Sequence, residues 1–169
     1  MHVDAIHVAS RFGPLSAVAD MNGVVIGASF QPLDVLVAKL IGIYGVLDVS
    51  VRTRSPILDA VTAYDNGECD AYQALKVRQP GGVFLQRVWA ALRTVSGGQV
   101  VTYAGLAHLA GSPKAARAAG TACSGNLVAP FVPCHRVVRA GGQLGNYGFG
   151  ADLKRRLLEH EAFSAQARQ

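Results

Sequence analysis

Apolar runs separated by turn signals dominate the first part of the chain. Residues 1–30 contain three such runs, divided by Gly13-Pro14 and by the polar stretch 20–23, which is the pattern of two or three short antiparallel strands. Residues 46–51 have strand composition as well and predict one more strand. The pattern therefore indicates a small sheet near the N-terminus.

Two helices are predicted beside this sheet. From Pro32 to Tyr44 the apolar residues recur on one face of a helix. Ser55 followed by Pro56 is typical of an N-cap with proline at the first helical position, and this helix should end by Asn66-Gly67. We therefore expect residues 1–78 to form an N-terminal α+β lobe, in which no motif indicates chemistry.

A run of turn-forming residues, Gln79-Pro80-Gly81-Gly82, marks a predicted domain boundary, so that residues 79–169 form a second domain. After the boundary a helix is expected from about residue 82 to residue 94. Its apolar face contains Phe84, Val88, Trp89 and Leu92. We interpret Trp89 as a core residue.

Two short helices joined by a tight turn are predicted next. Thr102 should cap a helix that ends at Gly111, and Ser112-Pro113 should begin another that runs to about Cys123. Helices connected in this way are a candidate helix-turn-helix. The second helix carries almost only small side chains apart from Arg117, so its backbone could approach another surface closely. That surface could be DNA or the core of the protein itself.

Charge is distributed unevenly along the chain. Residues 1–80 hold six Lys or Arg and eight Asp or Glu, whereas residues 81–169 hold ten and three. Clustered cations gain free energy on phosphates because condensed counterions are released. The C-terminal half is therefore a candidate for binding nucleic acid.

The chain shows no feature of a membrane or exported protein. Its longest apolar stretch, near residues 33–47, is interrupted by Asp34 and Lys39 and is too short to span a bilayer. The first residues read neither as a secretory signal nor as a transit peptide. We expect no membrane partner, and a cytoplasmic location or, in a eukaryote, a nuclear one.

The chain has three cysteines, at spacings that fit neither a zinc motif nor a disulfide framework: Cys69, Cys123 and Cys134. Cys69 and Cys123 are expected in the core, with a redox pair as the alternative. Cys134 precedes His135 and Arg136, and a neighbouring imidazole and guanidinium favour the nucleophilic thiolate. Cys134 could otherwise be a core residue, and a zinc site is not expected because zinc needs four ligands.

The stretch Pro133–Val137 is similar to the signature of O6-alkylguanine-DNA alkyltransferases. Further segments match that family in order and spacing: Thr102-Tyr103 with Leu106-Ala107, Arg117–Gly120, Gly125-Asn126, Gly145–Gly148 and Leu157–Glu161. The resemblance runs from about Phe84 to Glu161. It implies an α+β fold with a small N-terminal α/β lobe that is RNase H-like. The C-terminal domain would be mainly helical and winged-helix-like, and would contain the helix-turn-helix.

The resemblance implies direct-reversal DNA repair, in which the alkyl group of O6-alkylguanine passes once per molecule to Cys134. O4-alkylthymine is a further candidate substrate. His135 would relay the thiol proton through a water, and Glu161 would fix the tautomer of the imidazole. Tyr103 would rotate the nucleotide out of the duplex and donate a hydrogen bond to the base.

Further residues acquire roles by the same resemblance. Asn126 would support the site through hydrogen bonds, and the substrate pocket would include Val137, Tyr147 and Gly148. Many relatives carry serine where this chain has Gly148, whose backbone N–H would contact the base. Arg136 would anchor the region, with a surface phosphate contact as the alternative.

DNA binding is implied for the second helix of the pair. Arg117 would enter the duplex in place of the extruded guanine, and the small Ala118 and Gly120 would let the helix approach the minor groove. Ser112 would contribute to the same DNA-binding surface. The implied partner is double-stranded DNA containing O6-alkylguanine, bound by a monomer, and the reaction needs neither cofactor nor metal.

Three alternatives remain open from the sequence. A non-catalytic lesion binder of the alkyltransferase-like kind would lack the cysteine, so Cys134 argues against it. A cysteine hydrolase could use Cys134 and His135, and a winged-helix regulator could carry an inert thiol.

The tail from Phe163 to Gln169 has no apolar pattern and is expected to fray.

Overall fold

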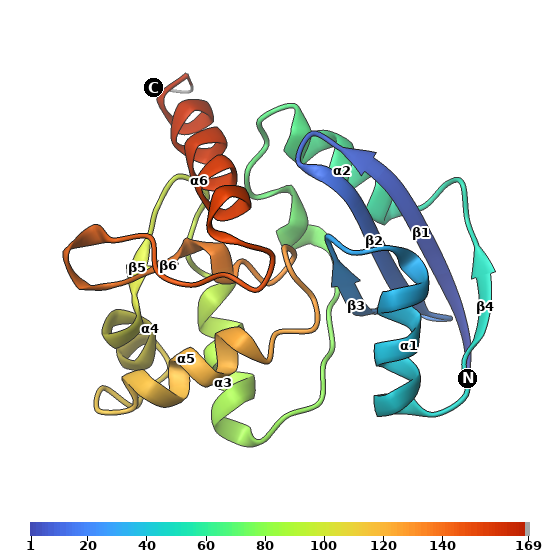
Figure 1. The fold of residues 1–169 in the computed structure, drawn as a ribbon, viewed down its shortest axis with the longest axis horizontal. Coiled ribbons are helices and arrows are strands. Elements are labelled where there is room, and N and C mark those ends of the chain that lie inside the picture. The colour runs from blue at the N-terminus through green and yellow to red at the C-terminus, as the bar shows by residue number, and fades with distance from the viewer. Residues whose placement is uncertain (168–169) are drawn as a thin grey trace. The chain divides into compact units, whose positions relative to one another are not determined.

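The computed structural model describes residues 1–167, which adopt a mixed α/β fold (Figure 1). The described chain packs as two compact units. The first comprises residues 1–79 together with Leu127–Phe131, and the second comprises Pro80–Asn126 together with the chain from Val132 onward. None of the helices in the described part has the length and apolar character needed to cross a membrane.

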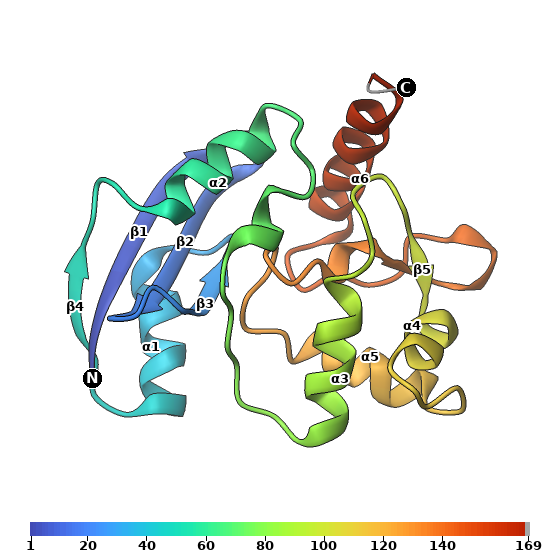
Figure 2. The same ribbon diagram turned by 180° about the vertical axis from the view of Figure 1, so that it is seen from behind.

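The first unit contains a four-stranded sheet in the order β3-β2-β1-β4 (Figure 2). Its strands are β1 (His2–Ser10), β2 (Gly13–Asp20), β3 (Val25–Ser29) and β4 (Asp48–Val51). The three N-terminal strands are antiparallel, whereas β4 runs parallel to β1. The strands predicted from the apolar runs are thus confirmed.

Two helices cover opposite faces of this sheet, as Figures 1 and 2 together show. Helix α1 (Leu33–Tyr44) packs Leu36 and Leu40 against the buried strand residues Val3, Val18 and Ile26. Helix α2 (Pro56–Asp65) begins where the sequence predicted, because the Ser55 hydroxyl accepts a hydrogen bond from the Ile57 N–H at 3.1 Å. A short 3-10 helix, η1 (Ala71–Ala74), follows α2.

The segment Leu127–Phe131 packs with the first unit, although it follows α5 in the sequence. Its backbone pairs with β3, where the Ala28 N–H donates to the Leu127 carbonyl at 2.8 Å. The Gln79 side chain accepts from the Leu127 N–H at 2.7 Å. These bonds satisfy backbone groups of β3, which is an edge strand of the sheet. The segment that pairs with such an edge carries no periodic pattern of its own in the sequence.

The second unit is mainly helical. Its elements are α3 (Val83–Leu92), β5 (Val101–Thr102), α4 (Tyr103–Leu109), α5 (Ala116–Ser124), η2 (Cys134–Arg136), β6 (Val137–Val138), η3 (Ala140–Gly142) and α6 (Ala151–Gln166). Trp89 of α3 is buried, and its indole N–H donates to the Ala122 carbonyl of α5 at 2.9 Å. The prediction that Trp89 is a core residue is confirmed.

The pair α4 and α5 is present, but the second helix starts later than the sequence predicted. Thr102 caps α4 by accepting from the Gly105 N–H at 3.0 Å, and Gly111 ends the helix with a φ of +76°. Ser112 does not cap α5, because its carbonyl accepts from the Ala115 N–H and closes a separate turn. The predicted start at Ser112-Pro113 is therefore wrong by about one turn.

Helix α6 continues further than expected. The chain from Phe163 to Gln166 is helical rather than frayed, and the final two residues of the predicted tail lie outside the described chain. Packing explains the difference: Ser164 is buried, and a Cβ at Gly98 would lie only 2.7 Å from the Ala165 methyl. This contact holds the last turn of α6 on the loop after α3.

Candidate active site

Cys134 begins the short 3-10 helix η2, and its side chain is 8% exposed. The Asn126 amide donates to the Cys134 sulfur at 3.2 Å and to the Val132 carbonyl at 2.8 Å. Burial raises the pKa of the thiol, and the Asn126 hydrogen bond and the charge of Lys154 offset part of this effect. A buried thiol of raised pKa needs a base to become a nucleophile.

An imidazole adjoins the thiol in sequence. His135 is fully buried, and its Nε2 lies 2.8 Å from Oε1 of Glu161 on α6. Its other nitrogen, Nδ1, is buried and has no hydrogen-bond partner within residues 1–167. If the carboxylate accepts the Nε2 proton, Nδ1 has a lone pair available to accept another.

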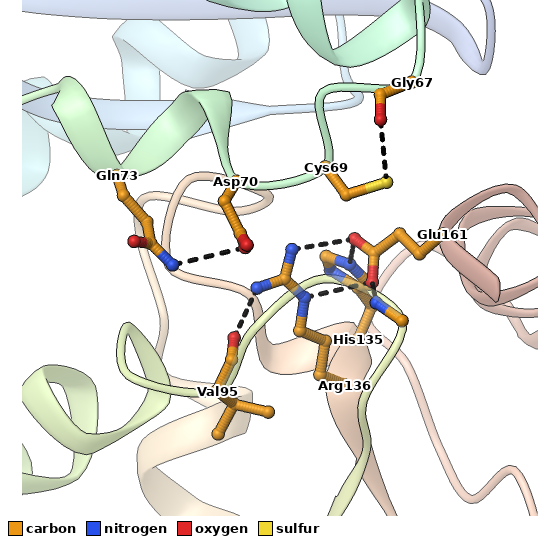
Figure 3. Close-up of polar contacts among 9 residues, drawn as sticks. Gly67, Cys69, Asp70, Gln73, Val95, His135, Arg136 and Glu161 are labelled. Carbon is orange, nitrogen blue, oxygen red and sulfur yellow. Dashed lines mark hydrogen bonds and ion pairs between the residues drawn. The ribbon is translucent and has the colours of Figure 1, made fainter. Parts of the chain in front are cut away.

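Arg136 completes a buried ionic cluster with these two residues (Figure 3). Its Nε donates to Oε2 of Glu161 at 3.0 Å, and its Nη2 donates to Oε1 at 3.0 Å. Nη1 donates to the Val95 carbonyl, which follows α3. Arg136 is only 3% exposed. The geometry therefore favours the anchoring role expected for it over a surface phosphate contact.

The charge of Glu161 is strongly stabilised. Burial by itself would raise the pKa of this carboxyl, but the interactions with His135 and Arg136 outweigh burial and lower the pKa to about 2. Glu161 is therefore ionised throughout the neutral range. It is a permanent acceptor for both neighbours.

Lys154 is a residue of this region that the sequence analysis did not identify. It is fully buried on α6, and its Nζ donates to the carbonyls of Val137 and, at 3.2 Å, Asn146. Burial lowers the pKa of the ammonium group, whereas Cys134 and Cys123 act in the opposite direction. Lys154 thus connects β6, the strand after the cysteine, to the loop before α6. Its spacing in the sequence could have identified it, because Lys154, Leu157 and Glu161 share the buried face of α6.

Tyr103 is the first residue of α4, and its ring lies against α5. A Cβ at Gly120 would lie 3.7 Å from the ring, in ordinary van der Waals contact. Burial raises the pKa of the Tyr103 phenol; the charges of Cys123 and Cys134 add to this, and the charge of Arg139 opposes it. The phenol therefore stays protonated at neutral pH.

Helix α5 has two different faces. Ala119 and Ala122 are fully buried against the rest of the unit, whereas Arg117 and Ala118 are exposed. One face of this small-residue helix thus packs against the core of the protein. The exposed face is available to a second molecule.

The loop before α6 contributes aromatic rings. The ring of Tyr147 lies 6.4 Å from the His135 ring and 5.4 Å from the Phe149 ring, in edge-to-face geometry in both cases. Gly148 is exposed, and a Cβ there would meet no atom within 4 Å. The space beside Gly148 is therefore open and could accommodate a larger side chain.

The remaining cysteines are free thiols. Cys69 is buried in the first unit, which confirms its interpretation as a core residue. Cys123 is half-buried at the end of α5, and burial, with a contribution from Cys134, raises its pKa to about 12. No group of three or more potential metal-ligating side chains gathers within the described chain.

Comparison with known proteins identifies the family. Residues 83–163 match the family model described as 6-O-methylguanine DNA methyltransferase, DNA binding domain. The methylated-DNA–protein-cysteine methyltransferase of Shigella flexneri is 31% identical over 160 residues, covering 92% of this chain and 94% of that protein. The chain belongs to the methylated-DNA–protein-cysteine methyltransferase family.

Further relatives support membership of this methyltransferase family. The Mycobacterium bovis methylated-DNA–protein-cysteine methyltransferase is 42% identical over 113 residues, covering 67% of this chain and 68% of that protein. The bifunctional transcriptional activator/DNA repair enzyme Ada of Escherichia coli is 49% identical over 82 residues, which span 48% of this chain and only 23% of Ada. The fold is similar to the crystal structure of Mycobacterium tuberculosis OGT in complex with DNA, with a TM-score of 0.76 and 31% sequence identity. The aligned residues cover 96% of this chain and 94% of the OGT chain.

Most residues predicted for the methyltransferase site converge in the second unit. Asn126 donates directly to the Cys134 sulfur, and His135, the neighbour of Cys134 in the chain, binds Glu161. The charge of Cys134 contributes to the raised pKa of Tyr103. Arg117 and Ala118 lie apart, on the exposed face of α5. Two groups of residues can thus be distinguished, one buried around the thiol and one presented at the surface.

Proposed function

We propose that this chain is a direct-reversal DNA repair protein that transfers the alkyl group of O6-alkylguanine in DNA to Cys134. The observation that carries the proposal is the buried cluster beside the thiol, in which Glu161 engages one nitrogen of His135 and leaves the other with a lone pair available. Family membership supplies the reaction class.

The chemistry is a single displacement at the alkyl carbon. The thiol proton passes to Nδ1 of His135, through a water, and the sulfur forms a bond to carbon while the bond from carbon to O6 breaks. Guanine leaves with the bonding pair, its developing negative charge is stabilised by hydrogen bonds from the Tyr103 phenol and the Gly148 N–H, and it takes up the proton that the His135 imidazolium releases. The product is a thioether, which has no easy hydrolytic exit, so each molecule acts once and needs no cofactor.

Glu161 and Asn126 act in support of these groups. The ionised carboxylate accepts the Nε2 proton of His135 and stabilises the imidazolium that forms. Asn126 ties the cysteine segment together through its two donated hydrogen bonds. Val137, Tyr147 and Gly148 would line the pocket for the extruded base, with the N–H of Gly148 as a donor.

DNA is proposed to bind at the exposed face of α5. Arg117 would occupy the space of the extruded guanine, and Ala118 and Gly120 would allow the helix to approach the minor groove. Ser112, in the turn before α5, would contact the backbone. We infer that α4 and α5 form a helix-turn-helix in a winged-helix-like domain, and that the N-terminal unit, residues 1–78 in the sequence-based division, is RNase H-like.

The proposed partner is double-stranded DNA containing O6-alkylguanine, with O4-alkylthymine as a second lesion. We propose that the protein acts as a monomer, in the cytoplasm or, in a eukaryote, in the nucleus. Many relatives carry serine at the position of Gly148, but the proposed contact is made by the backbone, so glycine retains it.

Transfer of labelled methyl from O6-methylguanine in duplex DNA tests the function. We expect a plateau near one methyl per chain, located on Cys134 by peptide mapping and abolished in Cys134→Ala. Cys69→Ala is the matched control and should transfer normally. Salt-sensitive DNA binding without transfer would indicate a lesion-binding protein instead, and continuous turnover would indicate a hydrolase.

A further inference from the structure

Arg139 stands beside Tyr103 at the ends of two paired strands. Strands β5 and β6 are parallel, with Val101 opposite Val137 and Thr102 opposite Val138. Tyr103, the first residue of α4, directly follows Thr102, and Arg139 directly follows Val138. Because the two strands are parallel, both residues leave the small sheet at the same end.

The backbone around Arg139 is fixed although the residue is exposed. Its N–H donates to the Gln143 carbonyl at 2.8 Å, and its carbonyl accepts from the Gly142 N–H at 3.1 Å. Gly141 and Gly142 have φ values of +79° and +78°, which a tight turn of this kind requires. Arg139 is thus presented from a defined turn.

The aliphatic part of the side chain is supported too. A Cβ at Gly145, where φ is +72°, would lie 3.3 Å from Cγ of Arg139, so the glycine leaves room for the arginine to lie against the loop. The stem is packed while the residue as a whole remains exposed. An arginine held in this way loses less conformational entropy when its charged group binds a ligand.

No carboxylate within residues 1–167 pairs with Arg139. Two other arginines of the second unit have such partners: Arg136 binds Glu161, and Arg155 binds Asp152 and Glu159. The charge of Arg139 does reach Tyr103, since it lowers the pKa of that phenol. The planar fork of an unpaired guanidinium can donate two parallel hydrogen bonds to two oxygens of one phosphate.

We propose that Arg139 binds the DNA phosphate next to the extruded guanine, taking it up as Tyr103 rotates the nucleotide out of the duplex. This inference rests on the proposed function, because it specifies how the same site holds its substrate. A nucleotide leaving the stack must move its phosphate, and a cation at the new position stabilises the rotated backbone. Arg139 acts on the phosphate and Tyr103 on the nucleotide, so binding and rotation are coupled.

The test compares two substrates in single-turnover transfer: duplex DNA containing O6-methylguanine, and O6-benzylguanine as a free base, which has no phosphate. Arg139→Gln should slow transfer from DNA by about ten- to a hundredfold, the range of a lost charge-assisted hydrogen bond. Transfer from the free base should stay within about twofold of the wild type. Arg139→Lys, which keeps the charge without the fork, should recover part of the rate on DNA.

Arg155→Gln is the matched control. It removes the same charge from an exposed arginine that already has carboxylate partners, and it should leave both rates unchanged. The salt dependence of DNA binding gives an independent measure, since loss of one phosphate contact should reduce the slope of log K against log salt by about one for Arg139→Gln.

The outcomes separate this inference from the proposed function. Equal slowing on DNA and on the free base would overturn the phosphate contact, because it would mean that Arg139 supports the fold of the site. An unchanged rate on DNA with an unchanged salt slope would overturn it as well. If the wild type transferred nothing from either substrate, the repair function would fail, and the salt slope of Arg139→Gln would still decide whether the phosphate contact exists.

Discussion

Replacement of Glu161 by glutamine is the most direct test of the buried cluster. The glutamine keeps the size of the side chain but removes the charge that binds Arg136 and His135. Arg136 would then be a buried cation without its counterion, and His135 would lose the acceptor that selects its tautomer. We expect both stability and transfer to suffer.

Two arguments give the loss of stability. The carboxyl pKa is lowered from 4.5 to about 2, and since each pH unit is worth about 1.4 kcal/mol, ionised Glu161 contributes roughly 3 kcal/mol. Removing one partner of a buried ion pair usually costs about 3–5 kcal/mol. A base that is no longer oriented should slow transfer by about a hundredfold.

The sign of the pH dependence follows from the lowered pKa. The contribution is fully present above pH 4.5, the ordinary value, and is lost as the pH falls toward 2. The difference in unfolding free energy between the wild type and Glu161→Gln should therefore be about 3 kcal/mol at pH 6 and roughly 2 kcal/mol smaller at pH 3. A difference that stays constant between these pH values would refute the reasoning.

Urea unfolding followed by Trp89 fluorescence is the suitable assay. Trp89 is the single tryptophan of the chain and is buried in the second unit, where it bonds to α5. Glu159→Gln on the same helix is the matched control. Glu159 is exposed and pairs with Arg155 on the surface, so its replacement should cost less than about 1 kcal/mol and show little change with pH.

Three further predictions concern the thiol and its surroundings. Methylation of Cys134 adds volume to a packed site, so calorimetry should show the alkylated protein less stable by about 1–3 kcal/mol; an unchanged Tm would contradict this. Lys154→Met keeps most of the volume but leaves the carbonyls of Val137 and Asn146 without their donor, and should cost about 1–3 kcal/mol in urea unfolding. Because burial raises the Cys134 pKa above its ordinary 9.0, its reaction with iodoacetamide should still be accelerating at pH 9, and a plateau below that pH would be inconsistent with the buried thiol.

Local signals explain what the sequence could predict of the fold. Ser55 and Thr102 cap helices through hydrogen bonds to residues two or three positions away, so the caps are visible in the sequence itself. The start of α5 was misplaced because Ser112 and Pro113 also suit a turn, and only the bond from Ala115 to Ser112 distinguishes the two. The pairing of Leu127–Phe131 with β3 depends on residues about a hundred positions away and leaves no local trace.

The candidate site shows the same division between residues recognisable from the local sequence and residues placed by distant contacts. Cys134 and His135 are neighbours in the chain, so their chemistry was recognisable from the local sequence. Glu161 was identified only through the family resemblance. The role of Arg136 was left open between an anchor and a surface contact, and its burial decides in favour of the anchor. Lys154 was missed because a lysine on a helix is ordinarily exposed, and nothing local indicates that its charged end meets two carbonyls.

The buried cluster shows why a short motif is not sufficient to define this site. Glu161 stands 26 positions after His135 and comes to it only because α6 packs on η2. Arg136 supplies positive charge beside the buried carboxylate. In the proposed reaction the arginine thus acts through the carboxylate, and the same peptide without α6 would have neither the acceptor nor the charge balance that the base needs.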